Sequence, residues 1–236
     1  MAMERKSFWD IPVAGIHPMT AVDFPGRLSC VLFTRGCPWK CRYCQNDSLR
    51  FQGECMPWEE IETFLRERVG FLEGVVISGG EPTLHPELCN LLAWIRKLGF
   101  AAAIHTNGFY PDMLRRILKK NLVDYVAMDI KAPPAAYRRI TQNENACIEV
   151  SRSISVILES GVDYEFRTTW HPSVLSENEL MDTLRSAAKS GIKKYYLQQF
   201  NSQGVSDREL VDAPFQSFPP AILSEARTLF PVFDVR

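Results

Sequence analysis

The sequence of 236 residues predicts an α/β protein: a partial, TIM-like (β/α)6 barrel with parallel strands inside and helices outside. Short runs of β-branched and aromatic residues alternate six times with longer amphipathic stretches, and parallel strands need such helical crossovers. Eight-unit barrels typically take about 250 residues, so six units and a long loop favour an incomplete barrel. A doubly wound sheet is the alternative, because periodicity alone does not separate the two.

The boundaries of the elements follow from prolines and glycines. Proline is tolerated in the first turn of a helix, and glycine often follows the last turn. We expect strands at residues 28–33, 75–78, 100–104, 125–128, 163–169 and 194–199. We expect helices at residues 57–69, 86–98, 111–120, 148–160, 177–189 and 220–229. We predict one domain over residues 1–236, with its core at about 15–200 and a C-terminal helix and tail at 201–236.

Composition excludes several classes of protein. Lys and Arg number 27 against 28 for Asp and Glu, a formal net charge of -1, so no broad basic field for nucleic acid is expected. No apolar run approaches the roughly 20 residues of a membrane-spanning helix. The first ten residues are rich in charge and lack the apolar segment of a secretory signal. We therefore expect a cytoplasmic protein with no nucleic-acid and no membrane partner.

The cysteines are the most informative part of the composition. Their odd number, seven, without a secretory signal favours metal binding, redox chemistry or burial over a disulfide framework. Cys37, Cys41 and Cys44 fall within eight residues, a spacing expected by chance roughly 0.006 times in this chain. The other four are expected to be buried as small apolar residues: Cys30, Cys55, Cys89 and Cys147.

Three thiolates in one loop can hold a metal centre. Soft sulfur ligands select iron–sulfur clusters, zinc or copper(I). A structural zinc site usually has cysteine pairs of two-residue spacing with a second pair further along, a combination that this chain lacks. The loop therefore favours an iron–sulfur cluster, with a zinc site as the alternative.

Further polar residues follow the next predicted strands, where the carboxyl ends of a parallel sheet gather the chemistry. The segments are Gly79-Gly80-Glu81-Pro82, Thr106-Asn107-Gly108 and Asp129-Ile130-Lys131. Each alone reads as a turn or a solvated strand end. Glycines also let a backbone approach a ligand, and a carboxylate accepts hydrogen bonds from an ammonium group.

The loop Cys37-x-x-x-Cys41-x-x-Cys44 after the first strand, combined with Gly-Gly-Glu-Pro after the second, resembles the radical S-adenosylmethionine (SAM) superfamily. The resemblance implies one 4Fe–4S cluster held by the three cysteines, whose open iron binds the amino and carboxylate groups of SAM. One electron then cleaves SAM to methionine and a 5'-deoxyadenosyl radical, so the cofactor carries the difficult chemistry.

The resemblance also implies how the cofactor is held. Tyr43 occupies an aromatic position that lies near the adenine, although packing of the loop accounts for it equally well. Gly79, Gly80 and Glu81 match the glycine-rich motif that binds the amino group of SAM.

Residues after the third and fourth strands match activating enzymes of the glycyl radical type. Thr106 and Asn107 belong to their T-N-G segment, while Asp129 and Lys131 belong to a D-L-K-like segment that holds the ribose and carboxylate. Some members have Asp before the Thr as part of a cation site. His105 stands there in this chain, which leaves that cation site open.

Arg167 matches an arginine close to the methionine portion of the cofactor, and an arginine in a buried strand needs an anionic ligand or an ion-pair partner. Gln198 and Gln199 occupy a place where relatives have a polar cofactor contact, which we assign to Gln199, although strand alternation does not settle which one points inward. His85 and His171 each precede a proline and are expected to order turns.

The amino-terminal part resembles the short activating enzymes of glycyl radical enzymes, and the matching motifs run from about Gly15 to Gln199. The closest likeness is to activating proteins of anaerobic ribonucleoside-triphosphate reductase, followed by those of pyruvate formate-lyase. The segments that carry it are 23–27, 36–37 and 43–46. Phe24 and Gln45 depart from the pattern, which more often has Gly and His there. The implied reaction removes a hydrogen atom from a backbone glycine of a partner enzyme.

About 31 residues separate Cys44 from the second strand, and Cys55 alone lies among them, so no second cluster of about four thiolates can form there. A group of four basic residues flanks the loop: Arg35, Lys40, Arg42 and Arg50. We interpret it as a solvated face, or alternatively as a docking surface for an acidic electron donor such as flavodoxin or a ferredoxin-like protein.

Two alternatives from other classes stay open. One is a small-molecule radical enzyme such as 7-carboxy-7-deazaguanine synthase, which shares the length, the cysteine loop and Gly-Gly-Glu-Pro. The other is a zinc-binding module without catalytic activity. The sequence does not identify the partner enzyme, the electron donor or the oligomeric state.

Overall fold

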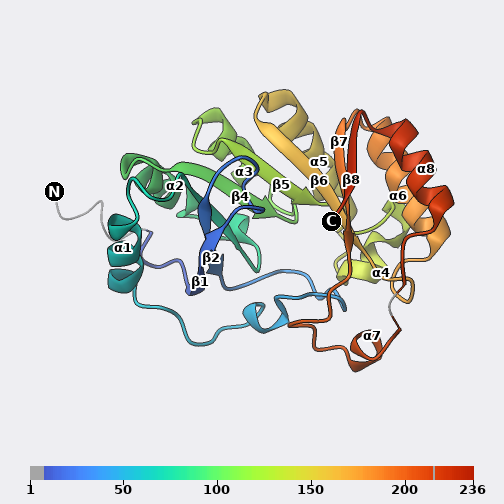
Figure 1. Ribbon diagram of the computed structural model, residues 1–236, viewed down its shortest axis with the longest axis horizontal. Helices are drawn as coiled ribbons and strands as arrows, with labels where there is room; N and C mark the ends of the chain where they lie inside the picture. Colours follow the sequence, from blue (N-terminus) through green and yellow to red (C-terminus); the bar gives the residue numbers. More distant parts are fainter. Residues whose placement is uncertain (1–7, 215) are drawn as a thin grey trace.

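The computed structural model of the protein describes residues 8–214 and 216–236. A single sheet has eight strands in the order β1-β2-β3-β4-β5-β6-β7-β8. Neighbours from β2 to β8 are parallel, and β1 is antiparallel to β2. Among the described strands β8 does not pair with β1, so the curved sheet is open (Figure 1). The predicted α/β class, with parallel strands in an incomplete barrel, is confirmed.

All six predicted strands form, each within two residues of its expected ends. The strands are β1 (Val13–Thr20), β2 (Ser29–Thr34), β3 (Gly74–Gly79), β4 (Ala101–Thr106), β5 (Tyr125–Asp129), β6 (Asp163–Trp170), β7 (Lys194–Gln199) and β8 (Val232–Val235). The sequence did not indicate β1 or β8. The first contains Pro18 and has three exposed residues in a row, and the second is four residues long, so neither has a clear alternating pattern.

The predicted helices also form, and Figure 1 shows them on the outer side of the curved sheet. They are α1 (Trp58–Glu67), α2 (Leu88–Lys97), α3 (Pro111–Lys119), α5 (Ala146–Ser160), α6 (Glu177–Lys189) and α8 (Pro220–Leu229). The short helices are α4 (Tyr137–Thr141), α7 (Arg208–Val211) and the 3-10 helices η1 (Asp47–Leu49), η2 (Pro82–Leu84) and η3 (Pro134–Ala136).

No helix among the described residues has the length and apolar character needed to cross a membrane. The expectation that a secretory signal is absent rests on residues 1–10. Residues 1–7 lie outside the part of the protein that the structure describes. The single domain over residues 1–236 stays a prediction.

Alternation along the strands divides the core into two layers. One set of side chains packs under the helices, as Leu32, Ile77, Ile104 and Met128 do. The alternate set, with Val31, Val76, Ala103 and Ala127, faces the inside of the curved sheet. Because both faces are buried, the strands read as nearly continuous apolar runs, which is typical of parallel sheets.

Phe24 fills the inside of the sheet from the turn between β1 and β2. Its side chain is buried, and its ring stacks on Tyr125 with 5.8 Å between centroids. It also lies against Gly74, where an added Cβ would come within 2.8 Å of the ring. Phe24, which departs from the pattern that the sequence resembles, thus has a packing role in this chain.

We expect Phe24→Ala to lower the free energy of unfolding by about 3–5 kcal/mol, because it removes a buried aromatic ring from a packed interior. Val22 is 73% exposed two residues away, so Val22→Ala is the matched control and should change stability by less than about 0.5 kcal/mol. Chemical denaturation followed by circular dichroism measures both variants. Equal stability of the two would show that Phe24 does not support the inner core.

Candidate active site

The three clustered cysteines line one cavity at the carboxyl ends of the strands. The loop that carries Cys37, Cys41 and Cys44 follows β2 directly, as predicted. The cavity has a volume of about 370 Å³. Its other walls come from the β1–β2 turn, from β2, from the loop itself and from the ends of β3 to β7: Asp23, Phe33, Trp39, Tyr43, Gln45, Asn46, Ser78, Gly79, Gly80, His105, Thr106, Asn107, Asp129, Lys131, Arg167, Thr169 and Gln198.

Gly79 and Gly80 allow two backbone segments to come together at this cavity. A Cβ on Gly79 would lie 2.2 Å from the carbonyl oxygen of Thr34, and one on Gly80 would lie 2.1 Å from that of Gly36. The amide of Gly80 donates to Thr34 O at 2.8 Å, and the amide of Glu81 donates to Gly36 O at 2.8 Å. The two glycines therefore dock the end of β3 against the start of the cysteine loop.

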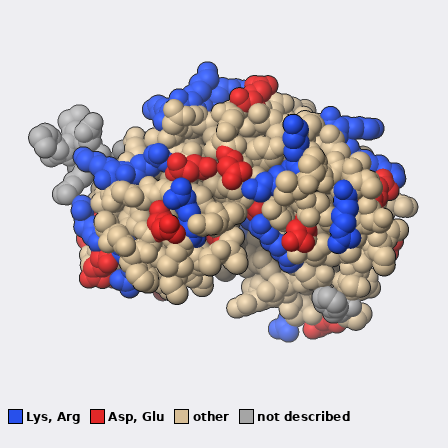
Figure 2. Space-filling model, turned by 45° about the horizontal axis from the view of Figure 1, so that its top comes forward, with Lys and Arg blue, Asp and Glu red and all other residues tan. Residues whose placement is uncertain are grey.

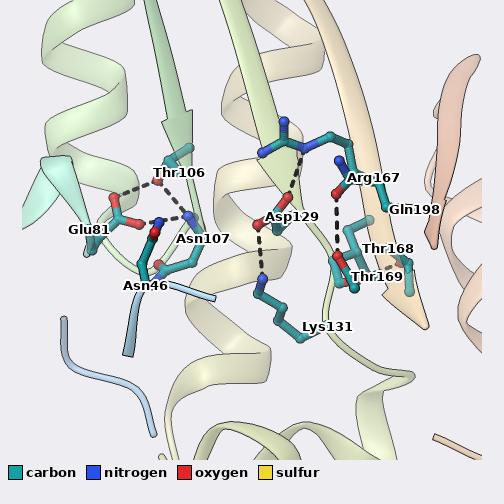
Figure 3. A network of polar contacts seen from close by, with 12 residues as sticks. Asn46, Glu81, Thr106, Asn107, Asp129, Lys131, Arg167, Thr168, Thr169 and Gln198 are labelled. Carbon is teal, nitrogen blue, oxygen red and sulfur yellow. Dashed lines mark hydrogen bonds and ion pairs between the residues drawn. The ribbon is translucent and has the colours of Figure 1, made fainter. Parts of the chain in front are cut away.

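Glu81 is fully buried and joins this region to the end of β4 (Figure 3). Its carboxylate accepts hydrogen bonds from Thr106 Oγ1 at 2.6 Å, the Asn107 amide at 2.6 Å and the Thr83 amide at 3.0 Å. The Thr83 hydroxyl donates a fourth hydrogen bond. Burial raises the pKa of the Glu81 carboxyl, and these donors oppose the rise. The structure gives Glu81 a clamping role, while a contact with the cofactor stays a prediction.

Asp129, Lys131 and Arg167 form a second network across the cavity (Figure 3). The Asp129 carboxylate accepts from Arg167 Nε and from Lys131 Nζ, each at 2.9 Å. Burial alone would raise the pKa of Asp129, but the two cations outweigh it and hold the pKa below its usual range. Lys131 also lies 5.5 Å from the centroid of the Tyr43 ring. Arg167 also lies 3.8 Å from the carboxylate of Glu165, which Arg236 binds at 3.0 Å. Three cationic side chains thus meet two carboxylates, and the surplus positive charge suits an anionic ligand.

His105 is buried on β4, directly before Thr106. Its Nε2 lies 2.9 Å from the backbone oxygen of Asp23. Burial, followed by the charge of Arg167, lowers the pKa of His105 to about 4, so the imidazole is neutral near pH 7. Within the described ranges, no three Asp, Glu, His or Cys side chains converge on a position for a single metal ion.

The two glutamines at the end of β7 point in opposite directions. Gln198 lines the cavity, and its Oε1 accepts from Thr169 Oγ1 at 3.3 Å. Gln199 does not line the cavity, and its side chain donates to the backbone oxygen of Gln216 at 2.9 Å. Strand alternation thus turns the predicted Gln199 away and brings its neighbour to the site.

The chemistry of the cavity fits a sulfur-ligated cluster with a bound cofactor. Burial raises the pKa of the Cys37 thiol to about 12 and that of Cys41 to about 11, so these sulfurs need a metal cation to become thiolates. Trp39 Nε1 and the Tyr43 hydroxyl are buried in the same wall without a hydrogen-bond partner in the described part of the protein. Such orphaned donors are costly unless a further group meets them.

Sequence reasoning missed several residues of the cavity. Thr169 lies two positions after Arg167 on β6, so strand alternation places it on the same face and was the signal for it. Asn46 follows the cysteine loop, and its side chain donates to the backbone oxygen of Gly79 at 3.0 Å. The position of Trp39 depends on the loop conformation, which has no periodic signal.

The scattered cysteines were only partly predicted. Cys30 and Cys89 are buried as expected, and Cys147 is half-buried. The prediction for Cys55 is wrong, because it is exposed in the segment between the loop and α1.

The two histidines that precede prolines order turns, as predicted. His85 Nε2 lies 2.9 Å from the backbone oxygen of Arg35. His171 Nδ1 accepts from the amide of Ser173 at 3.2 Å.

Two of the four basic residues beside the loop, Arg42 and Arg50, form ion pairs within the chain. Arg42 binds Asp207 at 2.5 Å and Glu209 at 2.7 Å, both in the segment after β7. The remaining two arginines are also engaged: Arg35 donates to backbone oxygens of residues 48, 51 and 54, and Arg50 binds Asp47 at 2.7 Å. Figure 2 shows acidic and basic side chains interspersed on the face it presents. The arginines therefore do not form the free basic docking surface considered from the sequence.

Comparison with known proteins agrees with this geometry. The family model described as the radical SAM superfamily matches residues 31–197. A protein of Methanocaldococcus jannaschii, named provisionally as a glycyl-radical enzyme activating enzyme, is 31% identical over 209 residues, which cover 86% of this chain and 85% of that protein. A 7-carboxy-7-deazaguanine synthase of Neisseria meningitidis is 30% identical over 126 residues, covering 53% of this chain and 52% of that enzyme.

Among solved structures, methylornithine synthase has the same fold. The TM-score is 0.66 at 14% identity, and the match covers 88% of this chain and 63% of that chain. This protein therefore spans less than two thirds of the methylornithine synthase chain. At this identity the similarity concerns the fold alone.

The chain belongs to the radical SAM superfamily. It is accordingly an enzyme that uses a 4Fe–4S cluster and S-adenosyl-L-methionine. The alternative of a zinc-binding module without catalytic activity is wrong, because the family model covers residues 31–197, which include the three cysteines and most of the cavity lining.

We expect Cys41→Ala to abolish cluster binding, because Cys41 is one of three thiols in the cavity and the two that are left cannot replace it. Iron and sulfide analysis with visible absorption after anaerobic reconstitution measures the loss. Cys55→Ala removes an exposed thiol outside the cavity and should keep full iron content. If the Cys41 variant bound as much iron as the Cys55 variant, the assignment of the loop would fail.

Proposed function

We propose that the protein is an activating enzyme that removes a hydrogen atom from a backbone glycine of a glycyl radical enzyme. The observation that carries the proposal is the similarity to the M. jannaschii protein over 86% of this chain and 85% of that protein. A similarity of this extent includes the parts outside the cofactor cavity. These parts are the ones that would differ between radical enzymes with different substrates.

The residues of the cavity have the following roles in the proposal. Cys37, Cys41 and Cys44 would hold the cluster, and Tyr43 would contact the adenine of the cofactor. The surplus positive charge of the network around Asp129 attracts the carboxylate of the cofactor. When bound, the cluster and SAM supply the 5'-deoxyadenosyl radical that removes the hydrogen atom.

Other residues complete the proposed cofactor site. Gly79, Gly80, Thr106 and Asn107 keep the loops at the end of β3 and β4 in place, and Glu81 joins them. Arg167 orients Asp129, and Gln198 takes the polar contact that the sequence assigned to Gln199.

The proposed partner is an anaerobic ribonucleotide reductase or a formate-lyase-like protein, and the proposed electron donor is a flavodoxin or a ferredoxin-like protein. The segment between Cys44 and α1 is short and contains one further thiol, that of Cys55. A second iron–sulfur cluster would need about four thiolates, so this segment supports a small activating enzyme with one cluster. Docking of the donor does not rest on Arg35, Arg42 and Arg50, whose side chains have partners within the chain.

The second candidate is a radical enzyme that acts on a small molecule. The similarity to 7-carboxy-7-deazaguanine synthase favours it, but that match covers 53% of this chain. A match over about half of each chain is expected for two enzymes that share cofactor binding and differ in their substrates. For this reason we rank it second.

Mixing the reconstituted protein, SAM and a low-potential reductant with an anaerobic ribonucleotide reductase should produce a glycyl radical that electron paramagnetic resonance detects. The signal should be absent with the Cys41→Ala protein, since no cluster is present to cleave SAM. The matched control is a reductase in which the radical glycine is replaced by alanine, which should also give no signal.

A specific result would contradict this function. If neither a reductase nor a formate-lyase-like protein acquired a radical, but 5'-deoxyadenosine formed with a small molecule, the second candidate would be correct. That outcome leaves the cofactor site intact and changes only the substrate.

A further inference from the structure

We propose that Asn107 sets the reduction potential of the cluster by donating a hydrogen bond from its side chain to the sulfur of Cys37. Asn107 Nδ2 lies 3.6 Å from Cys37 Sγ. This hydrogen bond joins a side-chain N–H group to a sulfur of the cysteine loop. The sequence assigned Asn107 to the cofactor, whereas its amide nitrogen faces a cluster ligand.

The orientation of this amide is determined by its other contacts. Asn107 Oδ1 accepts a hydrogen bond from the Phe109 amide at 2.9 Å. The oxygen must therefore face Phe109, which directs the NH2 group to Cys37. The backbone amide of Asn107 donates to Glu81 Oε2 at 2.6 Å, so the residue is fixed at both ends.

Burial makes this hydrogen bond effective. Asn107 is 7% exposed and lines the cavity beside Cys37. In surroundings of low polarity a hydrogen bond to a charged sulfur is stronger than in water. Backbone amides of Trp39 and Asn46 also act on Cys37 and Cys44, but a substitution does not remove those groups.

The direction of the effect follows from charge. One-electron reduction adds negative charge to the cluster and its thiolates, and an N–H donor stabilises that charge. Hydrogen bonds to the sulfurs are among the features that tune the potentials of iron–sulfur clusters. Asn107 therefore raises the potential and makes reduction easier. Glu81 is a positioning residue in this arrangement, because it acts through the backbone of Asn107.

This inference rests on the family and the geometry and does not depend on which substrate the enzyme uses. Its test is a potentiometric titration of the reconstituted holoprotein, without SAM, followed by electron paramagnetic resonance. Asn107→Ser removes the donor and is too short to reach the sulfur. Asn107→Asp keeps an oxygen that accepts from Phe109 but places a carboxylate beside the sulfur.

We expect Asn107→Ser to lower the equilibrium constant for one-electron reduction about tenfold, which is a negative shift of about 59 mV. Asn107→Asp should shift the potential further in the same direction, because it adds a negative charge. The matched control is Thr169→Val, which removes a hydroxyl group from the same cavity; that hydroxyl bonds to Gln198. Its potential should equal that of the wild type.

Two results would overturn the proposal. An unchanged potential in both Asn107 variants would mean that the hydrogen bond does not affect the redox step. Loss of iron from both variants, with iron retained in Thr169→Val, would assign Asn107 to cluster retention instead. Iron content measured alongside each titration distinguishes these results, and neither depends on the glycyl radical partner.

Discussion

The buried carboxylate of Glu81 is the contact on which the geometry of the site depends. It joins the end of β3 to the end of β4 through Thr106 and Asn107. Its own backbone amide binds Gly36, one residue before the first cysteine of the loop. A fully buried carboxylate is costly unless each oxygen has donors, and the donors here come from the segments that carry the chemistry. The carboxylate of Glu81 thereby fixes the T-N-G segment, while the backbone amide of the same residue holds the start of the cysteine loop.

On the opposite wall of the cavity, the polar side chains are stabilised by ion pairs between charges of opposite sign. Asp129 is held by the half-buried side chains of Lys131 and Arg167, and this network retains attraction for an anionic ligand. His105 lies next to this network and is neutral near pH 7, because burial lowers its pKa to about 4. The two walls thus differ in electrostatic character, with a clamp on the β3–β4 side and a cationic surface on the β5–β6 side (Figure 3).

The sequence predicted the parts of the molecule that have a local or periodic signal. The six central strands and the three clustered cysteines lay in continuous patterns, and the structure brings the predicted segments together. β1 lacked such a pattern, and the inward side chain of β7 depended on a register that one sequence does not fix. The pairing of Arg42 with Asp207 and the clamping role of Glu81 join residues far apart in the chain, so local reasoning did not identify them.

Hydrogen–deuterium exchange of Glu81→Gln protein compared with wild type tests the role of this carboxylate most directly. An amide in place of the carboxylate leaves buried donors without an acceptor, so peptides covering residues 81–84 and 104–109 should exchange faster, while α6 is unchanged. Unchanged exchange in both segments, together with weaker binding of SAM, would contradict the account. Glu81 would then act by touching the cofactor and not by holding the loops that surround it.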